Sequence, residues 1–129
     1  MHGAAQPLRV LVVDDSSVLR RQVCHALERS CGMAAVEAGD GAAAWLRLAE
    51  ARFDLVVTDI NMPVLDGLKL VALVRGSEGP NRMVPIVVVT TESAQADRDR
   101  ALALGASAYL VKPILAPQVV EAARQLLGL

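Results

Sequence analysis

Three aspartates stand directly after two apolar segments of the chain. Asp14 and Asp15 follow the apolar run of residues 8–13, and Asp59 ends the run of residues 55–59. Short, unbroken apolar runs are typical of strands buried on both faces of a parallel sheet. Ligands of open α/β sheets bind at the carboxyl ends of the strands, so we expect the three carboxylates to lie close together at that edge.

A hydroxyl group and an ammonium group are expected at the same edge. Thr90 ends the apolar run of residues 86–90, and Lys112 follows that of residues 108–111. A hydroxyl donor and a point positive charge are groups that bind phosphoryl oxygens. The five side chains together therefore predict a chemical site that handles a phosphoryl group beside the carboxylates.

The clustered carboxylates indicate a bound cation. Like charges close together are unfavourable unless a cation compensates them. Mg²⁺ is the natural candidate, because it prefers oxygen ligands, needs few protein groups and retains waters and phosphate oxygens. No nitrogen or sulfur ligand accompanies the acids, which argues against zinc. A divalent ion beside a carboxylate suggests phosphoryl transfer, because it screens the repulsion between an attacking carboxylate and an anionic donor.

Each of these residues also has an ordinary structural explanation. Asp14 and Asp15 can form a strand-end turn that caps a helix, and Asp59 can be a solvated acid at the end of a strand. Thr90 suits a strand because it is β-branched, and a lysine such as Lys112 is most often solvated. Their shared position at the ends of separate strands favours a chemical site.

Motifs of several other families are missing. The chain has no G-x-x-x-x-G-K-[ST] phosphate loop, no G-x-G-x-x-G after the first strand and no G-x-S-x-G elbow. An aspartyl-nucleophile phosphatase of the haloacid dehalogenase type usually has a second aspartate two residues after the first. Asn61 occupies that position after Asp59, and an amide cannot act as that general acid.

Five expected strands alternate with five expected helices. The strands are residues 8–13, 33–38, 55–59, 86–90 and 108–111, with the second at a sheet edge. Helix ends are marked by Ser16 or Ser17, Gly32, Asp40, Asp66, Gly76, Gly105 and Pro117. Such alternation with short loops predicts an α/β fold, in which a parallel five-stranded sheet carries helices on both faces.

The second and fourth helices differ in their apolar faces. Trp45, Leu46 and Ala49 are expected to form the buried stripe of the second helix. The fourth helix, residues 94–104, carries the alternating charges of residues 97–100 and has the smallest apolar face. Less burial therefore holds the fourth helix in place, and it is expected to move most easily.

Length and composition fit one domain. We expect a single domain over residues 1–129, with a flexible arm at about residues 1–7. The apolar content of 53% is enough for a core, and with a net charge of −1 the sequence has no basic stripe that would indicate nucleic-acid binding as the main function. No apolar stretch reaches the roughly 18 residues of a membrane span, and no signal peptide is recognisable. Cys24 and Cys31 lack a metal-binding spacing, so we expect free thiols in the cytoplasm.

Five short motifs follow one another along the chain. They are Val12-Val13-Asp14-Asp15-Ser16, Asp59-Ile60-Asn61-Met62-Pro63-Val64-Leu65-Asp66-Gly67, Val89-Thr90, Gly105-Ala106 and Lys112-Pro113. The set and its spacing resemble the response-regulator receiver domain of two-component signalling, from about Leu8 to Leu127. Within that family the chain is most similar to the chemotaxis (CheY-like) type, through Asn61, Glu92 and Tyr109.

The resemblance implies a flavodoxin-like sheet with strand order 2-1-3-4-5. It also implies that Asp59 accepts a phosphoryl group from a histidine kinase or a phosphotransfer protein. Mg²⁺ would be held by Asp15, Asp59 and the backbone carbonyl of Asn61, with Asp14 acting largely through water. Asn61 and Glu92 resemble the pair that positions a water to remove the phosphoryl group.

The resemblance also implies a switch. Thr90 would follow the phosphoryl group and let Tyr109 turn inward, while Lys112 would pair with the phosphoryl group. A downstream output protein would then bind the face formed by the fourth helix, the fifth strand and the fifth helix. The Lys112-Pro113 bond is expected to be cis, which is feasible because X-Pro bonds have only a small preference for trans.

Three positions depart from the family pattern. Thr91 stands where alanine or glycine is common, so access to the phosphoryl group is expected to be narrower. Ile114 replaces a frequent phenylalanine. Ile60 stands where the chemotaxis type often has tryptophan, so Trp45 is not expected to report on the site.

Several functions remain open from the sequence. The leading hypothesis is a free-standing, monomeric receiver that needs neither nucleic acid nor membrane and that binds a partner protein when phosphorylated. The alternatives are the receiver part of a larger transcription factor or enzyme, a small aspartyl-nucleophile phosphatase, and a degenerate receiver used as a passive docking module. Asn61 speaks against the phosphatase, and the complete set of key residues speaks against the degenerate module.

Overall fold

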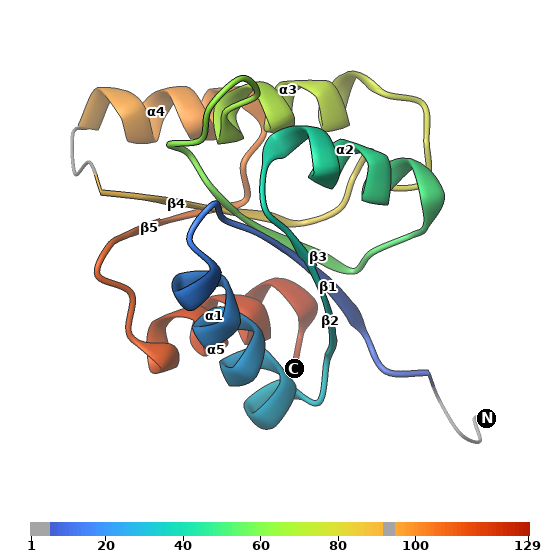
Figure 1. The fold of residues 1–129 in the computed structure, drawn as a ribbon, viewed down its shortest axis with the longest axis vertical. Helices are drawn as coiled ribbons and strands as arrows, with labels where there is room; N and C mark the ends of the chain where they lie inside the picture. Colours follow the sequence, from blue (N-terminus) through green and yellow to red (C-terminus); the bar gives the residue numbers. More distant parts are fainter. Residues whose placement is uncertain (1–5, 92–94) are drawn as a thin grey trace.

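The described strands form one parallel sheet (Figure 1). The computed structural model describes residues 6–91 and 95–129. Within them lie β1 (Arg9–Val13), β2 (Ala34–Ala38), β3 (Leu55–Asp59), β4 (Ile86–Thr90) and β5 (Ala108–Val111). They pair in the order β2-β1-β3-β4-β5, every pair parallel. The expected α/β class, strand order and edge position of β2 are confirmed.

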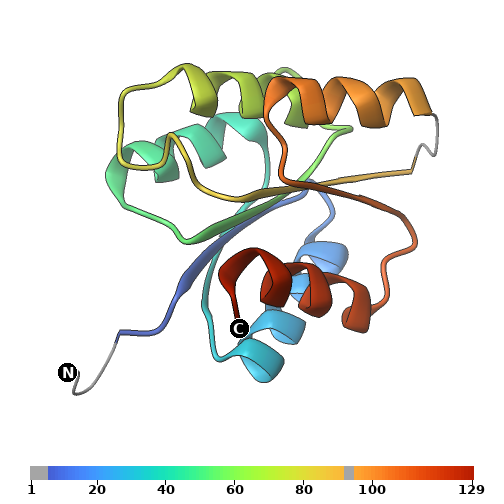
Figure 2. The same ribbon diagram turned by 180° about the vertical axis from the view of Figure 1, so that it is seen from behind.

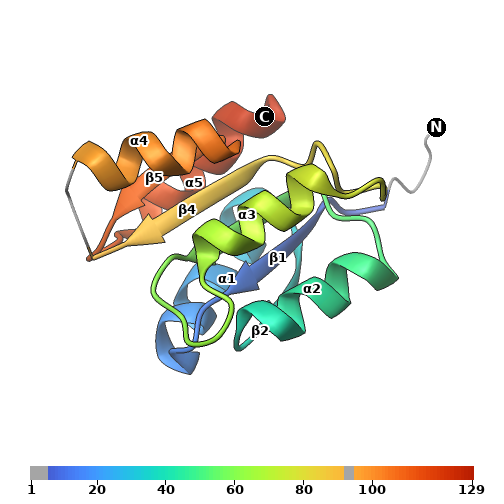
Figure 3. The same cartoon turned by 90° about the horizontal axis from the view of Figure 1, so that it is seen from above.

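Two layers of helices cover the sheet. The helices are α1 (Ser17–Cys31), α2 (Gly41–Glu50), α3 (Gly67–Gly76), α4 (Gln95–Leu104) and α5 (Ala116–Leu127). Figures 1 and 2 show α1 and α5 on one face and α2, α3 and α4 on the other. Figure 3 shows these three helices side by side above the sheet. Among the described residues, no helix is long and apolar enough to cross a bilayer.

The central strands divide the core into two aliphatic clusters. Every residue of β3 and β4 is buried, as expected for unbroken apolar runs. Because alternate residues of a strand point to opposite faces, Val56 and Val88 pack toward α2, α3 and α4, whereas Val57 and Val89 pack toward α1 and α5. This alternation also decides to which face each residue at the strand ends belongs.

Helix caps lie where the sequence predicts them. The Ser16 hydroxyl accepts from the backbone N–H of Leu19 at 3.3 Å, which identifies Ser16 rather than Ser17 as the cap of α1. Asp40 and Asp66 cap α2 and α3 in the same way. Gly32, with φ of +63°, ends α1 in the left-handed conformation that glycine adopts readily.

The expected apolar stripe of α2 is wrong at two of its three positions, because only Trp45 among them packs against the core. Gly41, Ala44 and Leu48 are the buried residues of this helix, whereas Leu46 is 63% exposed and Ala49 also faces solvent. A Cβ at Gly41 would collide with the carbonyl oxygen of Leu65. Small residues therefore form the buried face of α2, because they let the helix approach the loop after β3. A search for large apolar side chains does not detect them.

The fourth helix has little burial, as expected. Ala101 is the one buried residue along Gln95–Leu104. The first residue of the expected range, Ala94, lies outside the described residues, as does most of the expected arm of residues 1–7. The small apolar contribution of α4 is consistent with its being the helix that is least firmly held.

Gly67 allows α3 to begin directly beside the end of β3. A Cβ at this position would collide with the carbonyl oxygen of Asp59 and would lie 2.9 Å from the Cα of Ile60. The backbone N–H of Gly67 donates to the carbonyl oxygen of Ile60 at 3.0 Å. The start of α3 and the last residue of β3 are thus packed backbone to backbone.

Replacing Gly67 by alanine should destabilise the protein. We expect Gly67→Ala to lower the free energy of unfolding by about 1–3 kcal/mol, because the methyl group displaces the β3 end or α3. Gly76→Ala is the matched control: nothing lies within 4 Å of its added Cβ, so stability should stay the same or rise by up to about 1 kcal/mol. Urea denaturation measures both, and equal midpoints for the two variants would contradict the close packing.

Candidate functional site

Three carboxylates meet at the carboxyl edge of the sheet. Asp14 follows β1 and Asp59 ends β3, and both are buried, with 8% and 3% of their surface exposed. Asp15 faces solvent. One carboxylate oxygen from each residue lies within 4.8 Å of the others. The structure therefore brings together the three acids that the sequence predicts at one edge.

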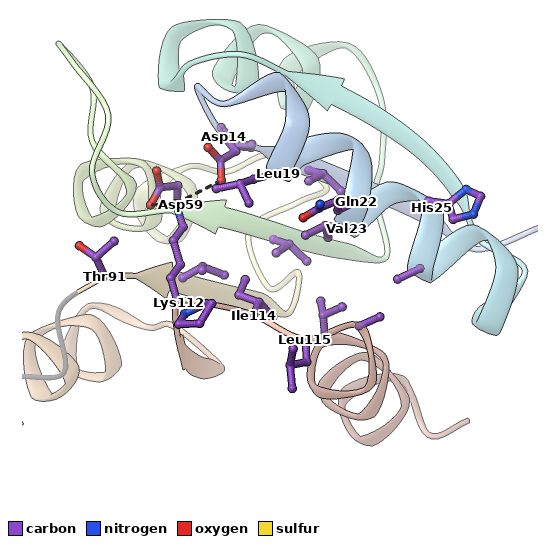
Figure 4. A pocket seen from close by; sticks show the side chains of 18 residues that line it. Asp14, Leu19, Gln22, Val23, His25, Asp59, Thr91, Lys112, Ile114 and Leu115 are labelled. Atoms are coloured by element: carbon purple, nitrogen blue, oxygen red, sulfur yellow. Dashed lines mark ion pairs between the residues drawn. The ribbon is translucent and has the colours of Figure 1, made fainter.

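The ammonium group of Lys112 lies between two of these acids. Lys112 follows β5, and its Nζ atom is 3.4 Å from Oδ1 of Asp59 and 3.5 Å from Oδ2 of Asp14. Figure 4 shows the lysine side chain extending along the sheet edge toward Asp59. Only 15% of this side chain is exposed, so solvent screens these ion pairs less than surface pairs. The Lys112-Pro113 peptide bond is cis, as expected.

Burial and the neighbouring charged groups shift the pKa of Asp59. Burial in the site raises the pKa of Asp59, and the negative charge of Asp14 raises it further. The ammonium group of Lys112 and the backbone N–H of Asn61, which donates to Oδ1 of Asp59 at 3.3 Å, lower the pKa. The net result is a raised pKa of Asp59, with burial as its largest cause and the negative charge of Asp14 as the second.

Asn61 and Thr91 are linked across the rim of the site. The side-chain amide of Asn61 donates to the hydroxyl oxygen of Thr91 at 3.4 Å, and both residues are exposed. Glu92, the predicted companion of Asn61, lies outside the described residues. The contact between Asn61 and Thr91 was not foreseen from the sequence, where Thr91 was considered for its size and not as a hydrogen-bond partner.

The predicted switch residues lie on the face of the sheet that α2, α3 and α4 cover. In the register of β4 and β5, Val88 pairs with Tyr109 and Thr90 with Val111. Val88 and Tyr109 both belong to the cluster beneath α2, α3 and α4, and Thr90, two residues after Val88, shares their face. Thr90 is buried with 1% exposed, and Tyr109 is half-buried. Thr91 instead lines the cleft beside Asp59.

Comparison with known proteins identifies the family. The family model described as response regulator receiver domain matches residues 10–124, nearly the whole chain. The chain belongs to this family. Receiver domains are phosphoacceptor switches of two-component signalling, and they interact with histidine kinases and output partners.

Individual relatives agree with this assignment. The chain is 41% identical to chemotaxis protein CheY1 of Helicobacter pylori over 115 residues, which cover 88% of this chain and 91% of the relative. The solved structure of the chemotaxis response regulator CheY4 of Vibrio cholerae superposes with a TM-score of 0.86 at 33% identity, and the match covers 94% of this chain and 99% of that one. The protein is thus a CheY-like receiver domain, as its motifs indicate.

A third relative bears on the cation. The receiver domain of a sensor histidine kinase of Pseudomonas aeruginosa PAO1 is 30% identical, with a TM-score of 0.82 and coverage of 96% of this chain and 100% of that one. Its structure has a magnesium ion coordinated in the active-site cleft. In the present receiver domain, three clustered carboxylates offer oxygen ligands without nitrogen or sulfur, and the exposed Asp15 leaves room for waters. This set of ligands fits Mg²⁺.

A cleft of about 660 Å³ adjoins the acids of the receiver domain. It runs between α1 and the segment from β5 to α5, with Asp59 and Lys112 toward one end and His25 toward the other (Figure 4). Leu19 and Leu115 line it and are 37% and 64% exposed. The sequence did not reveal this cleft, because the exposure of these leucines depends on how α1 and α5 pack.

Replacing Asp59 by asparagine should stabilise the metal-free receiver domain at neutral pH. A raised pKa means that the folded state binds the Asp59 proton more tightly than the unfolded state does. Its contribution to stability is therefore fully present below the ordinary pKa of an aspartate in the unfolded chain, and it is lost as the pH rises through the higher folded pKa. The ionised Asp59 carboxylate therefore lowers the free energy of unfolding at neutral pH, and the neutral amide of asparagine removes this cost.

Urea denaturation of wild type and Asp59→Asn between pH 4 and pH 8 measures this effect. We expect the variant to be more stable at pH 7 and the difference to shrink as the pH falls toward about 4, near the ordinary range of an aspartate. Asp54→Asn is the control. Asp54 is a half-buried carboxylate outside the cluster, and it accepts a hydrogen bond from the backbone N–H of Arg9. A wild-type protein more stable than Asp59→Asn at pH 7 would contradict the repulsive site.

Proposed function

We propose that this receiver domain accepts a phosphoryl group on Asp59 from a histidine kinase or a histidine phosphotransfer protein, in a reaction that depends on Mg²⁺. The observation that carries the proposal is the buried Asp59 carboxylate, 3.4 Å from the Lys112 ammonium group and within 4.8 Å of two further carboxylates. A nucleophile, a positive group for the phosphoryl oxygens and oxygen ligands for a cation thus share one site.

The transfer requires one bond to form and one to break. A carboxylate oxygen of Asp59 attacks the phosphorus atom, and the phosphorus–nitrogen bond of the donor phosphohistidine breaks. The imidazole nitrogen leaves with the electron pair and takes a proton, and an acyl phosphate remains on Asp59. Lys112 then pairs with a phosphoryl oxygen in place of the carboxylate oxygen that it faces now, while the hydroxyl of Thr90 donates to another.

The cation would be held by few protein groups. Asp15, Asp59 and the backbone carbonyl of Asn61 serve as direct ligands, and Asp14 acts mainly through a bound water. When bound, Mg²⁺ supplies positive charge that screens the repulsion between Asp59 and the anionic donor. Two observations support this role: the three carboxylates lie close together, and the negative charge of Asp14 acts unfavourably on Asp59. A divalent cation relieves this repulsion.

Removal of the phosphoryl group would involve Asn61 and Glu92. These two residues position the water that attacks phosphorus from the side opposite Asp59. The hydrogen bond from the Asn61 amide to Thr91 holds that amide at the rim of the site. Thr91 therefore acts on this reaction both through its bulk and through the direction of the amide.

The output surface would be the face of α4, β5 and α5. When the hydroxyl of Thr90 moves toward the phosphoryl group, Tyr109 enters the space that is vacated on the same face of the sheet. A downstream output protein binds the changed face. The small burial of α4 supports this choice, since less apolar contact holds this helix in one position. Phosphorylation shifts the equilibrium by its differential interaction with the two states.

The setting of the domain follows the chemotaxis type. We propose a single domain in the cytoplasm that acts as a monomer and binds proteins rather than nucleic acid or membrane. The alternative is a receiver that forms part of a larger transcription factor or enzyme. One solved relative is indeed the receiver domain of a sensor histidine kinase, so the length of the encoded gene discriminates between the two arrangements.

Phosphorylation of Asp59 is tested with a small-molecule phosphodonor. Incubation with the donor and Mg²⁺ should add one phosphoryl group to the wild-type protein, and mass spectrometry counts the groups. Asp59→Asn should take up none, because an amide is a poor nucleophile. Asp54→Asn is the matched control and should be labelled normally. Normal labelling of Asp59→Asn would refute the assignment of the phosphoacceptor.

Movement of the output face is tested by amide hydrogen exchange. We compare the protein with and without a stable phosphoryl mimic in the presence of Mg²⁺. Exchange should change mainly in α4 and β5, because Thr90 pairs with β5 and Tyr109 lies within β5, on the face that α4 covers. Asp59→Asn with the same additives controls for effects unrelated to the site. Changes confined to α1 and α2 would show that the output surface lies elsewhere.

A further inference from the structure

Arg20 binds the backbone at the point where β1 leaves the sheet. The pairing of β1 with β2 ends at Val13 and Ala38, and the backbone N–H of Asp14 donates to the carbonyl oxygen of Ala38 at 3.2 Å. The carbonyl oxygen of Asp14 lies beyond this ladder, and a buried carbonyl needs a donor. The Nη1 atom of Arg20 supplies it at 2.7 Å.

The guanidinium group of Arg20 is itself held by the edge strand. Its Nε atom donates to Oε1 of Glu37 in β2 at 2.8 Å, and only 18% of the arginine side chain is exposed. The planar guanidinium directs both hydrogen bonds from one rigid group. Arg21 lies 3.7 Å from the other carboxylate oxygen of Glu37, but it is 74% exposed. Arg20 thus connects β2 with the end of β1, whereas Arg21 remains at the surface.

This contact fixes the peptide unit that leads into Asp15. The carbonyl that Arg20 binds and the N–H of Asp15 belong to the same planar peptide group. On the other side, the carboxylate of Asp14 accepts the backbone N–H of Ser16 at 2.9 Å. Asp15 lies between these two anchored positions, and it is the solvent-exposed member of the carboxylate cluster. Burial does not orient its side chain, so the backbone direction must do so.

We propose that Arg20 is a positioning residue for the divalent-cation site. By holding the peptide between Asp14 and Asp15, it directs the Asp15 carboxylate toward Asp59, and Glu37 holds Arg20 for this task. The inference rests on the proposed function, in which Asp15 is a direct ligand of Mg²⁺. Arg20 contacts the backbone carbonyl oxygen of Asp14 rather than its carboxylate. Its effect is therefore geometric.

The experiment compares Mg²⁺ affinities of the unphosphorylated protein. The dissociation constant of Mg²⁺ is obtained from the shift of the melting temperature during a titration with the metal alone. Arg20→Gln should weaken binding about tenfold, in line with other residues that orient metal ligands. Arg20→Lys keeps the charge but lacks the forked donors, so it should restore affinity only in part. Arg21→Gln, which removes an arginine that contacts the same glutamate, should stay within about twofold of wild type.

A second measurement separates positioning from general stability. The rate of labelling by a small-molecule phosphodonor is followed as a function of Mg²⁺ concentration. Arg20→Gln should need about tenfold more metal for half-maximal rate and reach a wild-type rate at saturation, since Arg20 does not touch the reacting groups. The urea midpoint of the metal-free protein is recorded alongside. A lowered urea midpoint with an unchanged Mg²⁺ dissociation constant would overturn the inference.

Two further variants keep the inference testable if Arg20→Gln does not fold. Glu37→Gln keeps the shape of the side chain but loses the ion pair with Arg20, and it should weaken Mg²⁺ binding severalfold. Wild-type affinity in both Glu37→Gln and Arg20→Lys would overturn the role of Arg20. Failure of the wild-type protein itself to bind Mg²⁺ would remove the cation step of the proposed function and this inference with it. The two failures are thus distinguishable.

Discussion

The organisation of the site depends on the repulsion between carboxylates that the sheet forces together. Asp14 and Asp59 are both buried. Burial disfavours the charged form of Asp59, and the negative charge of Asp14 adds to this cost. The backbone of the parallel strands leaves these residues no freedom to separate. Lys112 reduces the repulsion between Asp14 and Asp59 without removing it. Added positive charge at this edge of the sheet therefore stabilises the domain.

The same scaffold explains why the charges stay in place. Every residue of β3 and β4 is buried, and the start of α3 packs directly against the backbone of Asp59 through Gly67. Movement of the acids apart would open this packing, so the aliphatic core holds the charges at short range. Stability and chemistry thus oppose each other at the end of β3, which is common where a site requires ionised groups away from water.

The sequence predicts much of this arrangement because each feature is local. Short apolar runs mark β3 and β4, and serine or aspartate caps mark the starts of α1, α2 and α3. The convergence of Asp14, Asp59 and Lys112 follows from parallel pairing. The buried face of α2 was not predictable in the same way, because Gly41 and Ala44 are chosen for close approach and not for hydrophobicity.

Long-range contacts of polar side chains were the other part that the sequence could not provide. The hydrogen bond between Asn61 and Thr91 joins two loops that are 30 residues apart, and the cleft beside α1 depends on how two distant helices pack. The partners of Arg20 are a backbone carbonyl and a side chain on the neighbouring edge strand. No residue type or spacing predicts such contacts, because a long polar side chain on α1 is equally compatible with a solvent-exposed position.

The alternation of side chains at the end of β4 places two neighbouring threonines in different environments. Thr91 lines the cleft next to Asp59, whereas Thr90 belongs to the face of Tyr109. A mutation at position 91 therefore alters surroundings that differ from those altered at position 90, although the two codons are adjacent. If the roles proposed for these positions hold, substitutions at two adjacent codons can change the lifetime of the phosphorylated state and the output surface independently of each other.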